Sequence, residues 1–267
     1  YKNKFSHLGS CLSAIDIIQA IYKVKRPNEK FILSNGHAAV AWYTVLEKEG
    51  LLKPAIAEKL KVHPERNEKY GITASTGSLG HGLPIALGMA LANPKKRVYC
   101  MISDGETMEG SVWETLRIAD TISEHSSSTS LKVHNLILII NYNGYGAYMK
   151  IPKNPLVKKL KGFGWLVKEI DGHDPQQIKK ALHARRGTPC KAIFAKTTVN
   201  QLPFLKGQDA HYKVMNEEEY KLAMEIIIDD ELEAEDMYDK YSHQSWTRSW
   251  WQWWLREIPL RLLPWWL

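Results

Sequence analysis

Apolar and polar positions follow two different repeats along the chain. Apolar residues at helical spacing predict helices, and short apolar runs predict strands. The repeats alternate, and this predicts an α/β fold: a doubly wound, mostly parallel sheet with helices on both faces. The predicted helices are 11–24, 38–48, 53–61, 80–92, 109–122 and 175–184, and the predicted strands are 30–33, 98–102, 136–140, 165–170 and 192–198.

Two polar segments interrupt this pattern. Residues 123–134 are rich in serine, and residues 200–214 contain Pro203, Gly207 and few apolar residues. We expect both to be loops. A loop as long as 200–214 is uncommon in a compact domain unless it serves the function or is disordered.

Charge divides the chain unevenly. The net charge of the 267 residues is +7, but residues 229–267 carry −4 and residues 1–228 carry +11. A basic body suggests anionic ligands such as phosphates. No run of Arg and Lys with interleaved aromatic residues is present, so we do not expect a nucleic-acid partner.

Three widely spaced cysteines, Cys11, Cys100 and Cys190, exclude a disulfide scaffold and a CxxC zinc site and suit a reducing compartment. The first residues lack the basic-then-apolar stretch of a signal peptide. No segment approaches the roughly 20 apolar residues that cross a bilayer. We therefore expect a cytoplasmic protein.

Seven of the ten tryptophans lie between Trp246 and Trp266. This composition predicts a main domain over residues 1–228 and an appendage over 229–267, with an acidic linker and a Trp-rich end. Trp246, Trp250, Trp253 and Trp254 fall on one helical face, which is too apolar to be left in water. We expect that face to dock on a partner subunit or a second copy. Contact with a membrane surface, or a foreign sequence with no evolved role, are the alternatives.

Candidate chemistry lies after two neighbouring strands. Asp104-Gly105 follows the strand at 98–102, and Asn143-Gly144 follows the strand at 136–140. Ligands of doubly wound sheets bind beyond such strand ends. Asp and Asn offer the hard oxygens that Mg²⁺ or Ca²⁺ prefers, and Gly105 lets a phosphate approach the backbone. The helix that starts near Glu109 would point its positive end there. Read alone, both dipeptides are also ordinary turns.

The surrounding residues resemble the thiamine-diphosphate signature, and the flanking sequence EGSVWE at 109–114 resembles the transketolase family in particular. Further segments resemble family motifs in the family's order, over roughly residues 5–225. They are 6–13 (SHLGSCLS), 33–38 (LSNGHA), 63–65 (HPE), 76–82 (TGSLGHG), 171–174 (DGHD) and 210–211 (AH).

The resemblance implies thiamine diphosphate and Mg²⁺ as cofactors, with Ca²⁺ as a possible substitute. It assigns the metal to Asp104, Asn143 and the carbonyl of Tyr145. The cofactor-binding residues that it implies are His37, Gly77, Ser78, Leu79, Asp104, Gly105, Glu106, Asn143, Tyr145 and His211.

The same resemblance implies that His7, His37, His63 and His211 line the channel to the reactive carbon, where neutral imidazoles accept hydrogen bonds and move protons. Glu109 and Glu114 match glutamates near the family's dimer contact, and Glu109 is a candidate for a shared-proton link between two sites. His81 and His173 we expect to be structural.

Two features depart from the family pattern. Ser103 stands where the family usually has Gly before the Asp, which puts cofactor affinity in question. The spacing from Asp104 to Asn143 is longer than is typical of the family, and the loop 123–134 accounts for the excess on the side far from the cofactor.

Length then suggests the kind of enzyme. A full transketolase is more than twice as long and carries a second domain whose Glu activates the cofactor. We therefore expect the N-terminal subunit of a two-chain transketolase-like enzyme that transfers a two-carbon ketol unit between sugar or sugar phosphate substrates. Its partner would be a C-terminal, pyrimidine-binding subunit, in a heterotetramer or larger. The alternatives are a subunit of an enzyme acting on a 2-oxo acid and a non-catalytic regulatory paralogue.

Overall fold

The computed structural model describes residues 4–57, 59–125, 133–183 and 190–226. The chain divides into two compact units, His7–Lys213 and a second unit made of Tyr1–Ser6 with Val214–Leu267. In the second unit the described residues include a helix at 217–226. The predicted domain boundary at 228/229 and the Trp-rich segment lie outside the described residues.

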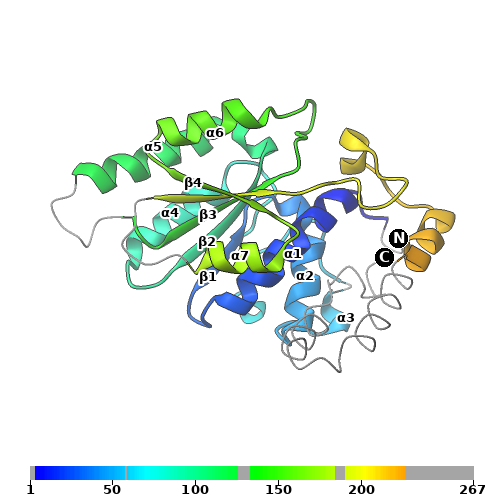
Figure 1. Ribbon diagram of the computed structural model, residues 1–267. Coiled ribbons are helices and arrows are strands. Elements are labelled where there is room, and N and C mark those ends of the chain that lie inside the picture. Colours follow the sequence, from blue (N-terminus) through cyan, green and yellow to red (C-terminus); the bar gives the residue numbers. More distant parts are fainter. Residues whose placement is uncertain (1–3, 58, 126–132, 184–189, 227–267) are drawn as a thin grey trace, which may run out of the picture. The chain divides into compact units, whose positions relative to one another are not determined.

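The first unit is built on a five-stranded sheet (Figure 1). Its strands are β1 (Lys30–Leu33), β2 (Val98–Ser103), β3 (Leu136–Tyr142), β4 (Leu166–Asp171) and β5 (Lys191–Lys196), in the order β1-β2-β3-β5-β4. Every pair of neighbours is parallel, so the predicted sheet is confirmed. After β3 the chain skips one position to β4 and returns to β5, which reverses the direction of winding.

Helices cover both faces of the sheet (Figure 1). On one face α4 (Gly82–Ala92), α5 (Gly110–His125) and α6 (Lys153–Gly162) share a buried apolar cluster with the central strands. On the other face α1 (Leu8–Val24) packs against α2 (Ala39–Lys48) and α7 (Pro175–Leu182). The doubly wound arrangement is therefore confirmed.

Short elements complete the unit. They are α3 (Pro54–Ala57) and the 3-10 turns η1 (Gly36–Ala38), η2 (Glu68–Tyr70), η3 (Gly105–Met108) and η4 (Gly207–His211). The helix predicted over 53–61 was too long, since only the single turn α3 forms among its described residues. One turn fixes several dihedral angles for few hydrogen bonds, so such helices are costly to start.

α6 was not predicted. Four of its ten residues are lysines, and its buried residues are only Leu156, Val157 and Leu160, so the apolar stripe is too sparse to stand out. Pro155 lies in its first turn, where the absence of an N–H group costs nothing.

The parallel register puts the serine-rich connection and the candidate chemistry at opposite edges. β3 begins at Leu136, so the residues before it lie at the N-terminal edge, while Asn143 follows the carboxyl end. The extra length between Asp104 and Asn143 is thus on the far side, as predicted. Among the described residues no helix is long and apolar enough to cross a membrane.

Candidate functional site

Asp104 lies directly after β2 and is fully buried. Its backbone N–H donates to the carbonyl of Asn141 on β3 at 3.1 Å, which ties the two strand ends together. Its carboxylate accepts hydrogen bonds from the N–H groups of Gly105 (3.0 Å) and Gly144 (2.7 Å). Burial raises the pKa of Asp104 to about 7 despite these donors. A carboxylate held this way, by backbone N–H groups, is suited to a metal ion.

Asn143 follows β3 and is only partly exposed. Its side-chain oxygen accepts from the N–H of Tyr145 at 2.9 Å, which closes a tight turn and fixes the backbone at Tyr145. The Tyr145 ring lies against Gly207, where a Cβ would be 3.2 Å from the Tyr145 hydroxyl oxygen and φ is +50°. The turn after β3 is therefore closely packed on the turn η4.

These residues fit a divalent cation. One carboxylate, one carboxamide and one carbonyl are hard oxygen donors, as Mg²⁺ prefers. Among the described residues no group of three or more His, Cys, Asp and Glu could hold a metal, so a site here depends on the neutral oxygens as well. A Cβ at Gly105 would lie 3.2 Å from the Cα of Gly146, so the two backbones approach each other closely.

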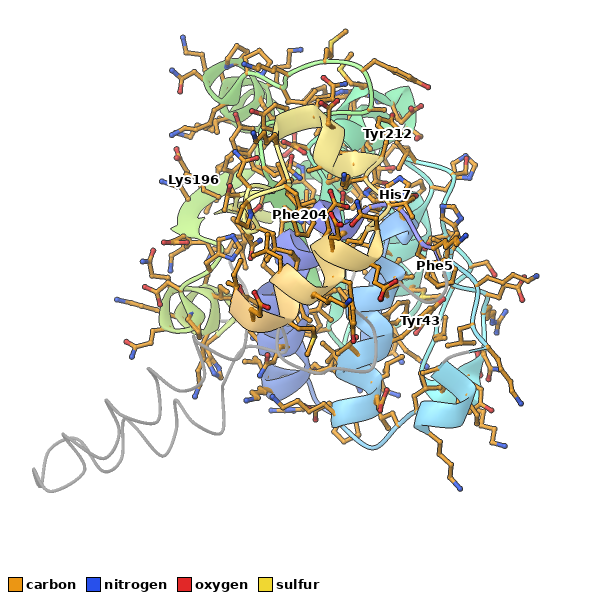
Figure 2. All side chains as sticks on the ribbon, turned by 90° about the vertical axis from the view of Figure 1, so that its right-hand side faces the viewer. Phe5, His7, Tyr43, Lys196, Phe204 and Tyr212 are labelled. Atoms are coloured by element: carbon orange, nitrogen blue, oxygen red, sulfur yellow. The ribbon has the colours of Figure 1, made fainter. Side chains whose placement is uncertain are left out.

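Histidines gather at the same edge. The rings of His7 and His37 have centroids 5.0 Å apart. Tyr212 lies near His7 (Figure 2), with 6.1 Å between the two ring centroids. Burial lowers the pKa of His37 to about 3, and nearby His7, His211 and His63 contribute to the shift. Burial likewise lowers the pKa of His7 to about 4, with contributions from His211 and His63. The structure thus brings the four predicted histidines together and keeps these two rings neutral.

Each histidine comes from a different element. His7 precedes α1 in the left-handed conformation (φ 70°), which is unusual outside glycine, and His37 lies in η1. The exposed His63 ring covers Gly77, where a Cβ would lie 2.7 Å from Cδ2 of His63. Burial lowers the pKa of His211, in η4, while a hydrogen bond with the Gln208 backbone opposes the shift.

Glu106 is fully buried, and its carboxylate is occupied by other parts of the chain. It accepts from the Ser34 hydroxyl (2.5 Å) and the N–H groups of Gly80 and Ser103 (both 2.9 Å). Burial raises its pKa to about 7. Glu106 therefore fastens the turns after β1 and β2 to the segment that contains Gly77, Ser78 and Leu79. Its hydrogen bonds thus hold the predicted cofactor-binding turns in place from the buried side.

Ser103 and Glu109 lie near this network. The Ser103 hydroxyl accepts from the N–H of Glu106 at 3.3 Å, so it belongs to the turn after β2. The exposed Glu109 packs against Gly80, where a Cβ would be 2.7 Å from the Cβ of Glu109. Glu109 thus stands where the segment that leads into α4 meets the turn that leads into α5.

Comparison with known proteins agrees with this geometry. Residues 2–254 match the family described as "Transketolase, thiamine diphosphate binding domain". The chain belongs to the transketolase family. The match extends beyond residue 225, where the recognisable motifs end.

Two kinds of curated relative are found among transketolases. The chain is 34% identical over 217 residues to the transketolase of Homo sapiens, a match that covers 72% of this chain and 33% of that protein. It is 30% identical over 252 residues to an apulose-4-phosphate transketolase subunit of Actinobacillus succinogenes, covering 84% of this chain and 88% of that protein. The chain therefore spans about a third of the length of the full-length transketolases that it matches. It spans most of the length of the relative that is named as one subunit of a transketolase.

A solved structure shows the same fold. The transketolase of Campylobacter jejuni matches with a TM-score of 0.64 at 21% identity, covering 84% of this chain and 42% of that one. At this identity the likeness supports the fold alone.

One residue of this edge was not predicted from the sequence. Asn35 lies between Ser34 and His37 and is 1% exposed, yet neither polar atom of its side chain has a hydrogen-bond partner within the described part of the chain. Burying an unsatisfied amide is costly, so such a group beside a binding site points to a ligand. Its place inside the motif 33–38 was the available signal.

Proposed function

We propose that this chain is the N-terminal subunit of a two-chain transketolase-like enzyme. It would bind Mg²⁺ and thiamine diphosphate and transfer a two-carbon ketol unit between sugar phosphates. The observation that carries the proposal is the juxtaposition of Asp104 and Asn143, on neighbouring strand ends, with four clustered histidines. The relative from Actinobacillus succinogenes, itself named as one transketolase subunit, supports the two-chain form.

Each part of the cofactor has candidate contacts in the structure. Asp104, Asn143 and the carbonyl of Tyr145 would hold the metal, and the unsatisfied Asn35 side chain adds a donor and an acceptor. Gly105, His37 and His211 would contact the diphosphate, and the backbone from Gly77 to Leu79 the aminopyrimidine. The bound cofactor supplies the carbon–carbon bond cleavage.

The histidines would orient the sugar and move protons. A neutral imidazole accepts a hydrogen bond from a hydroxyl, and His7 and His37 stay neutral at pH 7 because their pKa values are lowered to about 4 and about 3. His63 is the exposed member, so it is the one best placed to meet an arriving substrate.

An apolar surface would receive the partner subunit. α4 is apolar along almost its whole length, yet Pro84, Ile85 and Gly88 on it are exposed, and Met108, just before α5, is 60% exposed. A helix that is apolar all round is normally buried. Glu109 lies beside the start of this helix through its contact with Gly80, which suits a link across the interface.

The test uses the chain alone and together with its candidate partner. Isothermal titration with thiamine diphosphate, with and without Mg²⁺, should show weak binding to the lone chain and Mg²⁺-dependent binding to the pair. The pair should consume a ketose phosphate. Consumption of pyruvate instead would favour a 2-oxo acid enzyme, and absence of Mg²⁺-dependent binding would favour a non-catalytic paralogue. Robust ketol transfer by the lone chain would contradict the two-chain form.

A further inference from the structure

One face of α1 is joined to the end of β5 by two chains of hydrogen bonds. Ser13 and Asp16 are three residues apart on α1 and so lie on the same side of the helix. Both are buried, with Ser13 fully inaccessible and Asp16 8% exposed. Ser13 begins the first chain and Asp16 the second.

The first chain of hydrogen bonds passes through β3. The side-chain NH₂ group of Asn141 donates to the Ser13 hydroxyl at 3.1 Å, and the Thr197 hydroxyl donates to the side-chain oxygen Oδ1 of Asn141 at 2.6 Å. The N–H of Thr197 also donates to the carbonyl of Tyr142 at 2.8 Å. Thr197 is therefore bound to β3 directly and to α1 through Asn141.

The second chain passes through His173, in the turn after β4. Its Nδ1 lies 2.7 Å from Oδ2 of Asp16, and the N–H of Thr198 donates to its Nε2 at 3.1 Å. A backbone N–H only donates, so Nε2 must present its lone pair. The ring proton of neutral His173 then lies on Nδ1 and is donated to Asp16. The contacts on both sides thus select one tautomer.

Close packing connects the two chains of hydrogen bonds to the candidate site. A Cβ at Gly172 would clash with Cγ2 of Thr197, so the turn with His173 rests directly on the segment after β5. A Cβ at Gly9 would lie 2.8 Å from the Cβ of Ala210 and 3.2 Å from that of Val199. The first turn of α1 therefore touches the segment 199–210 without intervening side chains.

Two of the clustered histidines flank this contact. His7 precedes α1 and His211 follows Ala210, so a shift of α1 along the segment 199–210 would change the separation of the two rings. Figure 2 shows this segment leading from Lys196, at the end of β5, through Phe204 to Tyr212 beside His7. No strand holds residues 199–206, all of which the structure describes. Their position therefore depends on buried side chains such as Val199 and Leu205 and on hydrogen bonds of the kind that His173 makes.

We propose that His173 is a positioning residue: through Asp16 and Thr198 it fixes the register of α1 against the segment 197–211, and thereby the placement of His7 and His211. The Ser13–Asn141–Thr197 chain acts in parallel. The structural part stands on the hydrogen bonds alone, whereas the consequence for substrate binding rests on the proposed function.

Hydrogen exchange of the chain, followed by mass spectrometry, tests the structural part. In His173→Ala and in Asp16→Ala, we expect amides in 199–211 to exchange about tenfold faster, as the loss of one buried hydrogen bond allows. The double variant should exchange no faster than the faster single variant, because both residues belong to one chain of hydrogen bonds. His183→Asn, at an exposed histidine after α7, is the control and should leave 199–211 unchanged.

Two results would overturn the structural part. One is unchanged exchange in 199–211, and the other is equal acceleration in the β2 and β3 peptides, which would indicate general loss of stability. His173→Gln keeps an acceptor near Nε2 but lacks the donor to Asp16, so it gives a second measurement should the alanine variant not fold.

The functional part is tested in the reconstituted pair. With His173→Ala, the KM for the sugar phosphate should rise about tenfold while kcat changes less than about twofold, since the substrate-facing rings are misplaced and the cofactor is retained. Equal losses in kcat and kcat/KM, or an unchanged KM despite faster local exchange, would contradict it. If the wild-type pair transfers no ketol unit, the proposed function is wrong. The hydrogen-exchange experiment would still test whether His173 fixes the register of α1 against the segment 197–211.

Discussion

At the scale of single residues, the site combines satisfied and unsatisfied buried groups. Glu106 and Asp104 are buried carboxylates whose oxygens accept several hydrogen bonds. Asn35 is equally buried, but its carboxamide has no partner in the described residues. The contrast marks Asn35 as the buried group whose hydrogen bonds a ligand would supply.

Replacing Asn35 with alanine should affect binding and stability in opposite directions. Asn35→Ala removes an unsatisfied buried amide, so the free energy of unfolding of the ligand-free chain should stay the same or rise by up to about 1 kcal/mol. Thiamine diphosphate should bind the reconstituted pair about tenfold more weakly, measured by titration calorimetry. Reduced stability together with unchanged cofactor affinity would show that Asn35 is a purely structural residue.

His37 should make stability depend on pH in the acid range. Its pKa is about 3 in the folded chain against 6.5 for the free side chain, so between these values the unfolded state binds more protons. The stability that His37 contributes is therefore complete above pH 6.5 and is lost as the pH falls toward 3. Between pH 7 and 5, His37 should account for a loss of about 1–2 kcal/mol.

Urea unfolding at pH 7 and pH 5 measures this loss. His37→Gln should flatten the pH dependence, whereas His183→Gln, at an exposed position, should leave it as in the wild type. An unchanged slope in His37→Gln would mean that His37 binds as many protons in the folded chain as in the unfolded chain over this pH range.

At the scale of elements, one carboxylate joins turns from three parts of the sequence. Glu106→Gln puts an amide NH₂ group against N–H donors, so at least one of the Gly80 and Ser103 contacts must be lost. We expect a loss of about 1–3 kcal/mol in unfolding free energy, measured by urea unfolding at pH 8. Glu109→Gln, at an exposed position, should cost less than about 0.5 kcal/mol. Similar values for the two variants would refute a role for Glu106 in fastening the turns.

The helices and strands also show how much of the fold can be predicted from the sequence. All five strands were predicted within a few residues, because buried parallel strands are continuous apolar runs. α6 was missed because its lysines hide a narrow apolar stripe. The clustering of the four histidines could be predicted from the order of the motifs. The unsatisfied side chain of Asn35 and the Asp16–His173 contact could not, because both depend on how distant segments pack in the folded chain.

At the scale of the whole molecule, the exposed face of α4 is the surface on which we propose that the partner subunit docks. Pro84, Gly88 and Ala92 are exposed and one helical turn apart, so this side of α4 offers small residues over which another surface can approach closely. Ile85 and Met108 supply apolar area nearby.

Gly88→Glu tests this face without disturbing the monomer. A Cβ at Gly88 meets no atom within 4 Å, so the glutamate fits the isolated chain, and replacing a helical glycine should preserve or slightly raise its stability. In the assembly, the same side chain would bury an unpaired charge, which should weaken binding of the partner at least tenfold. Gly162→Glu, at the end of α6, is the matched control because its Cβ also points into open space. Analytical ultracentrifugation of each variant with the partner measures the association. Equal association of the two variants would place the partner elsewhere, and a selective loss in Gly88→Glu would locate it on α4.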